Sequence, residues 1–142
     1  MQLQRHFYLR ALGIISIKAI AYTVLMVLAI DFFAENIPMK VFLLAMTVVF
    51  FLVTFLFGEW IFSVPRMPAR GVAIAIIITY LLDVFLNTLI WSYLWEANLF
   101  YTFDAGHQLI MFTLHAAALG AAYYERKRLG IFGKGPVEGI AS

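Results

Sequence analysis

Long apolar runs, separated by short polar breaks, make up most of this chain. The uninterrupted runs cover about residues 11–33, 41–63, 71–95 and 105–124. A helix rises about 1.5 Å per residue, so each run is long enough to cross the roughly 30 Å of hydrocarbon in a bilayer. The pattern therefore predicts an all-α integral membrane protein with four transmembrane helices.

The breaks between the runs are short and rich in residues that end helices. The first two breaks contain proline, and the third contains Asn, Asp and Gly. Short connections favour antiparallel neighbours, so we expect an up-down-up-down bundle that forms a single domain over residues 1–129. Residues 130–142 are rich in glycine and cannot continue the last helix, so we expect a cytoplasmic tail there.

Basic residues fall almost entirely on one side of the predicted membrane. Nine of the ten lie near the N-terminus, in the second break or after the last run: Arg5, Arg10, Lys18, Arg66, Arg70, Arg126, Lys127, Arg128 and Lys134. Lys40 alone lies on the other side. Because basic residues concentrate on the cytoplasmic side of membrane proteins, we expect both termini in the cytoplasm and the prokaryotic plasma membrane as the location.

Composition narrows the possible functions. The chain is 64% hydrophobic and 13% charged, which excludes a soluble globular domain. It has no cysteine, so disulfides and thiolate metal sites are excluded within the chain. The net charge of +2 is too small to indicate a nucleic-acid partner. We expect contacts with membrane lipids, no nucleic acid and no cofactor.

Two ionisable residues lie deep in the predicted hydrocarbon region. Asp83 is roughly 18 Å along the third run from Gly71, and His115 is roughly 16 Å along the fourth from Arg126. Charges in hydrocarbon are costly, so such residues require a partner or a function. Their equal depth predicts that Asp83 and His115 meet near the middle of the bilayer.

Further polar residues extend this site along one face of the third run. Thr79 and Tyr80 are one turn before Asp83, and Asn87 is one turn after it. Two interpretations remain open. Buried polar residues often hold membrane helices together, which is the interpretation we favour. Asp and His also exchange protons near neutral pH, so the same cluster could conduct protons or cations.

A second pair of charges is predicted nearer the cytoplasmic side. Lys18 lies about two turns inside the first run, and Glu59 lies about two turns inside the second. The matching depths predict a structural ion pair that fixes the packing of these two helices.

The fourth run carries consecutive small residues, from Ala116 to Ala122. Small residues let helices approach closely, so Ala116 and Gly120 are the expected helix interface. His107 and His115 also lie in this run, but about 12 Å apart along one helix they cannot both reach a single metal ion. We therefore expect no metal site.

The sequence favours a non-catalytic membrane protein over an enzyme. We expect an accessory, scaffold or assembly subunit of a larger membrane complex, or a homo-oligomer, because the chain shows no catalytic motif and has a helix suited to contact. The alternative is a small protein that conducts or transports protons or ions through the predicted Asp83–His115 pair.

Overall fold

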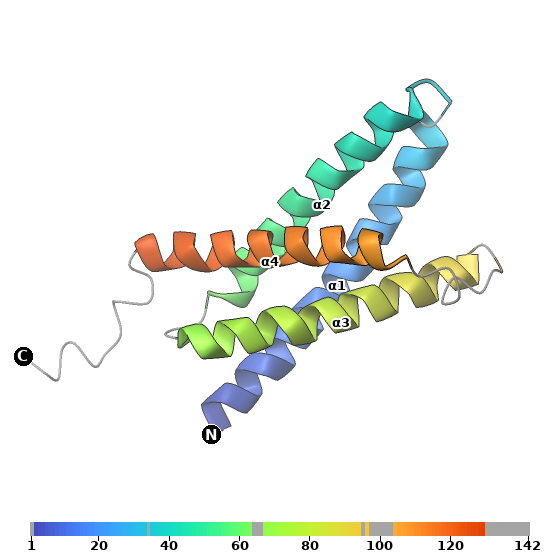
Figure 1. Ribbon diagram of the computed structural model, residues 1–142. Helices are drawn as coiled ribbons and strands as arrows, with labels where there is room; N and C mark the ends of the chain where they lie inside the picture. Colours follow the sequence, from blue (N-terminus) through green and yellow to red (C-terminus); the bar gives the residue numbers. More distant parts are fainter. Residues whose placement is uncertain (1, 34, 64–66, 95, 97–103, 130–142) are drawn as a thin grey trace, which may run out of the picture.

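The structure is a computed structural model that describes residues 2–33, 35–63, 67–94, 96 and 104–129 (Figure 1). These residues form four helices: α1 (Gln2–Phe33), α2 (Met39–Ile61), α3 (Ala69–Leu94) and α4 (Ala105–Arg128). The prediction of an all-helical chain is confirmed. The predicted tail, 130–142, lies outside the described residues.

Three of the four helices are long and apolar enough to cross a membrane. These segments are Arg5–Phe33, Met39–Ile61 and Ala69–Leu94. The fourth helix is not among them, which corrects the prediction of four apolar spans. The reason lies in its composition, because eight of the 24 residues of α4 are Ala or Gly, polar residues such as His107 and Gln108 interrupt it, and it ends in three basic residues.

The helices pack as two hairpins that meet at one end. The closest packing is between α1 and α3 and between α2 and α4, whereas the two helices of each hairpin pack less closely on each other. In Figure 1, α1 and α2 run up to their turn at the upper right, while α3 runs at an angle to them towards its C-terminal end at the right. The two hairpins therefore diverge, and the bundle is open at the end where the turn between α1 and α2 lies.

A compact apolar core holds the other end together. Its members come from all four helices and the segment before α3: Phe7, Ala11, Ile14, Ile15, Ile61, Phe62, Met67, Val72, Ala75, Leu119 and Ala122. At its centre Gly58 of α2 lies directly against α4. A Cβ atom placed on Gly58 would come within 2.8 Å of both Ala122 Cβ and Leu119 Cδ2. Only glycine permits this approach of α2 to α4.

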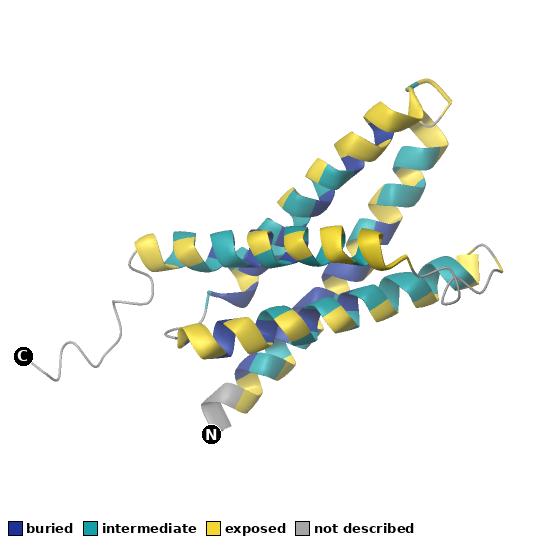
Figure 2. Cartoon of the chain, viewed as in Figure 1, coloured by how far each residue is buried: buried dark blue, intermediate teal, exposed yellow. Residues whose placement is uncertain are grey.

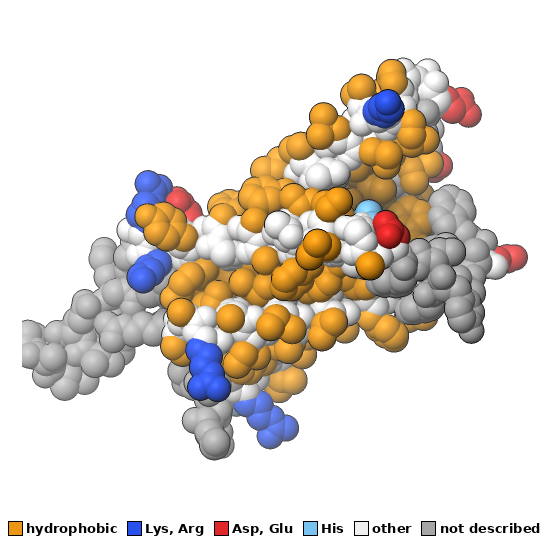
Figure 3. Space-filling model, viewed as in Figure 1, with side chains coloured by type: hydrophobic (Ala, Val, Ile, Leu, Met, Phe, Trp, Pro, Cys, Tyr) orange, Lys and Arg blue, Asp and Glu red, His pale blue; other side chains and the backbone are white. Residues whose placement is uncertain are grey.

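The outer surface of the helices is strongly apolar. Large side chains such as Leu44, Leu56, Leu81 and Phe32 are mostly exposed. In Figure 3 hydrophobic side chains form a broad band, and charged side chains lie towards its ends. Figure 2 shows the buried residues gathered where the hairpins cross. Such a surface suits a lipid environment, and together with the three apolar helices it indicates a membrane protein.

Candidate functional site

A buried ion pair joins the first hairpin to the second. Lys18 of α1 donates a hydrogen bond from Nζ to Asp83 Oδ2 of α3 at 2.6 Å. Lys18 is 0% exposed and Asp83 is 2% exposed. The pair forms because α1 packs most closely on α3, which places the middle of one helix against the middle of the other.

This pairing differs from the expected one between Lys18 and Glu59. Glu59 instead forms an ion pair with Arg126 of α4. Equal depth in the membrane was the basis of the expectation, but depth does not determine which helices are neighbours. Each charge pairs with the helix on which its own helix packs, so α1 pairs with α3 and α2 pairs with α4.

Aromatic rings surround the ammonium group. Lys18 Nζ lies 4.0 Å from the centroid of the Phe50 ring and 5.5 Å from that of Tyr22. The electron-rich face of an aromatic ring attracts a cation, and the attraction is stronger where water is excluded. Neither ring was singled out in the sequence, because aromatic residues are too common in membrane helices to indicate a site.

Asn87 holds the other oxygen of the carboxylate. Its Nδ2 donates to Asp83 Oδ1 at 3.0 Å and to the Asp83 carbonyl at 2.9 Å. Thr23 Oγ1 of α1 lies 3.1 Å from Asn87 Oδ1 and 2.8 Å from the Ala19 carbonyl, so its one hydroxyl proton is shared between these two acceptors. The predicted polar stripe of α3 is thus tied to α1. Thr23 was missed from the sequence, where an isolated threonine in an apolar run gives no signal.

His115 lies behind the ion pair and is fully buried. Its Nε2 is 3.1 Å from Thr79 Oγ1, and that hydroxyl is 2.6 Å from the Ala75 carbonyl. The hydroxyl has one proton, which it donates to the carbonyl, so His115 donates from Nε2 to Thr79. The opposite nitrogen, Nδ1, is 3.9 Å from Asp83 Oδ2 and makes no hydrogen bond to the described residues.

The predicted meeting of Asp83 and His115 is therefore only approximate. The two side chains lie near each other, but Lys18 holds the carboxylate oxygen that faces the imidazole. Tyr80, the remaining member of the predicted stripe, faces α4, donating its hydroxyl to Gln108 and packing edge-on against His115. The predicted cluster is thus brought together, with Lys18 as an additional member.

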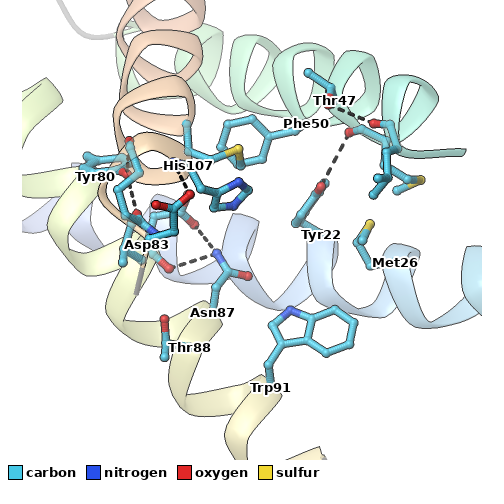
Figure 4. Close-up of a pocket in the computed structure, with 16 residues that line it drawn as sticks. Tyr22, Met26, Thr47, Phe50, Tyr80, Asp83, Asn87, Thr88, Trp91 and His107 are labelled. Atoms are coloured by element: carbon cyan, nitrogen blue, oxygen red, sulfur yellow. Dashed lines mark hydrogen bonds between the residues drawn. The ribbon is translucent and has the colours of Figure 1, made fainter. Parts of the chain in front are cut away.

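A cavity of about 690 Å³ reaches this cluster from the open end of the bundle. All four helices line it, mainly with apolar and aromatic side chains, and Asp83 and Asn87 form part of its wall. Figure 4 shows Tyr22, Phe50 and Trp91 around the space beside these two polar residues. The ion pair is therefore buried but lies at the boundary of a space large enough for a small molecule.

The small residues of α4 make contact on a different face from the one expected. Ala118, Leu119 and Ala122 are buried, and the last two lie against Gly58. The predicted interface residues Ala116 and Gly120 are only half-buried, and a Cβ on Gly120 would meet nothing within 4 Å. Within this chain, the face that carries Gly120 is not a tight helix contact.

In comparisons with known proteins, no family model matches the chain, and no curated protein or solved structure matches it either. Fold and site alone therefore define its class. The chain is an all-helical membrane protein with three apolar helices long enough to span a bilayer and a buried ion pair beside a cavity.

Proposed function

We propose that this chain is a small membrane transport protein that moves protons or cations through the site around Asp83. One observation carries the proposal: Asp83 forms a buried ion pair with Lys18 and also lines a large cavity. Ionisable residues within membrane segments are costly to bury, and those that occur mark ion pathways and proton relays in many membrane proteins, so they indicate a functional site.

An alternative interpretation is that these residues only hold helices together. It does not explain two features of the site. A packing contact does not need a cavity of about 690 Å³ beside its carboxylate. It also does not need a buried imidazole whose Nδ1 makes no hydrogen bond to the described residues. In the transport proposal, the cavity admits the ion, and His115 Nδ1 accepts a proton from the ion pair.

The direction of access follows from the charge distribution. The basic residues near the core end, such as Arg5, Arg70 and Lys127, favour placing that end in the cytoplasm. In this orientation both termini are cytoplasmic, the cavity faces outward, and the apolar core closes the cytoplasmic side. Transport then requires the core end to open, which would disturb the Glu59–Arg126 pair.

Proton flux into liposomes tests the proposal. A pH gradient and a membrane potential are imposed across vesicles that contain the purified protein. The pH inside these vesicles should then change faster than in empty vesicles. Asp83→Asn keeps the size of the side chain but cannot exchange a proton, so it should lower the flux at least about tenfold. Asp31→Asn removes an exposed carboxylate of α1 and serves as the control, with unchanged flux. If the parent protein conducts no more than empty vesicles, the proposal fails.

A second candidate function is a non-catalytic subunit of a larger membrane complex, or a homo-oligomer. It is favoured by α4, which, among the helices of the described residues, is the one not apolar enough to span by itself. Its outer face exposes Ala117 and leaves open space around Gly120. If α4 lies within the membrane, a protein neighbour on this face suits its weak hydrophobicity better than lipid does.

A further inference from the structure

We propose that the cavity binds an organic cation with an apolar body, whose positive group lies beside Asp83. This inference rests on the proposed transport function for its purpose, since such a cation would be the substrate. Its evidence is the size of the cavity, its charge and its aromatic lining.

The cavity has the dimensions and lining of a small-molecule site. Its volume of about 690 Å³ lies within the range of about 300 to 1,000 Å³ that is usual for such sites. Met26, Met46 and Met111 line it together with aromatic residues, so the wall is adaptable and mainly apolar. A ligand that fills it therefore needs an apolar body and few polar groups.

The charges that line the cavity favour a cation. Two carboxylates, Asp83 and Asp104, form part of the wall, and no Lys or Arg is among the described residues that line it. The ammonium group of Lys18 lies behind Asp83, fully buried. An anion would thus meet two carboxylates with no Lys or Arg at the described surface of the cavity to offset them, so the charges favour a cation over an anion.

The aromatic wall already binds a positive group within the chain. Lys18 Nζ stacks on the Phe50 ring at 4.0 Å from its centroid. Figure 4 shows Phe50, Tyr22 and Trp91 on different sides of the space next to Asp83. Aromatic rings arranged around a space, with a carboxylate nearby, are the usual means of recognising substituted ammonium ions.

Binding must be balanced against the charge of Lys18. A second cation beside Asp83 would place two positive charges against one carboxylate in a site that excludes water, which is costly. Neutrality is kept if one N–H bond of the Lys18 ammonium breaks, the electron pair stays on nitrogen and the proton goes to water. One cation thus enters the site as one proton leaves it, and the net charge is unchanged.

The exchange makes binding depend on pH. The titratable groups that face the site are Lys18 and Tyr22 of α1, Tyr80 and Asp83 of α3, and Asp104, His107 and His115 at or in α4. Among the described residues, α2 contributes none to the cavity wall. Release of one proton makes binding tighter as the pH rises, by up to about tenfold per pH unit.

Calorimetry with the full chain in detergent tests the proposal, using benzyltrimethylammonium, whose charge does not depend on pH. We expect saturable binding that tightens with pH. The neutral 3-phenylpropanol and the anionic 3-phenylpropanoate should each bind at least about tenfold more weakly. Equal binding of either compound would overturn the proposal.

Variants locate the cation within the cavity. Asp83→Asn should weaken binding at least about tenfold, and Phe50→Leu should weaken it severalfold. The exposed Asp31→Asn is the charge-matched control and should bind like the parent. Circular dichroism and gel filtration check that Asp83→Asn is folded. If it is not folded, the binding of the three probe compounds to the parent and to Phe50→Leu tests the proposal instead. An Asp83→Asn variant that folds and binds like the parent would overturn the proposal.

Comparison with proton flux, measured both with and without benzyltrimethylammonium outside the vesicles, separates this inference from the proposed function. Cation binding without flux from the parent supports the site and contradicts transport. Proton flux without cation binding supports transport and contradicts the site.

Discussion

At the scale of single residues, the Lys18–Asp83 pair is the feature with the largest energetic consequence. Both groups have been removed from water, and each satisfies the other together with Asn87 and the Phe50 ring. Removing one partner of a buried pair is far more damaging than replacing both, because a single charge is then left in an apolar interior.

Lys18→Met should therefore destabilise the protein by about 3 to 5 kcal/mol, since Asp83 loses its counter-ion. The double variant Lys18→Met/Asp83→Leu should recover much of this loss, because it leaves no buried charge. Thermal unfolding in detergent, followed by circular dichroism, measures both. A double variant that is less stable than Lys18→Met would show that the pair is not the source of the effect.

Only part of this site could be predicted from the sequence. Asp83 and His115 are conspicuous because ionisable residues are rare in apolar runs, and helical spacing linked Asp83 to Asn87 and Thr79. The partner of Lys18 could not be predicted, because it depends on which helix lies beside which. The sequence placed Lys18 about two turns inside the first apolar run, whereas α1 extends back to Gln2 and places it in the middle of a long helix.

At the scale of helices, the contact between α2 and α4 depends on Gly58. The apolar runs predicted that both helices exist, and the small residues of α4 predicted a close contact. Within the chain the contact uses a different face from the predicted one, because consecutive small residues occupy every side of a helix and do not indicate which side is buried. The glycine on the partner helix is the residue that determines it.

Gly58→Leu should destabilise the bundle by at least about 1 to 3 kcal/mol, because the added side chain would overlap Ala122 and Leu119. Gly120→Leu is the matched control on α4 and should not destabilise the isolated chain, because a Cβ there meets open space. Unfolding in detergent compares the two. Equal destabilisation would contradict the contact described for Gly58.

The same Gly120→Leu variant reports on association. If α4 contacts another subunit through this face, the variant should reduce the size of the assembly in gel filtration or crosslinking while the chain itself stays folded. An unchanged assembly would remove the support that α4 gives to the subunit function.

At the scale of the whole molecule, orientation in the membrane follows from the positions of the basic residues. A reporter fused after Ser142 should be cytoplasmic, and a reporter inserted at Asn36, between α1 and α2, should be external. Protease protection or alkaline phosphatase activity in cells measures both positions. A Ser142 fusion found outside the cell would contradict the orientation, and with it the outward-facing cavity.

Two ion pairs described above, Lys18–Asp83 and Glu59–Arg126, join the two hairpins and have a consequence for biosynthesis. The hairpin made first, α1 with α2, contains Lys18 and Glu59, and the hairpin made second contains their counter-ions, Asp83 and Arg126. Until the second hairpin has been synthesised, Lys18 and Glu59 of the first hairpin lack these counter-ions. Each half thus carries one positive and one negative site that only the other half satisfies, so the two halves are complementary fragments that recognise each other in one register.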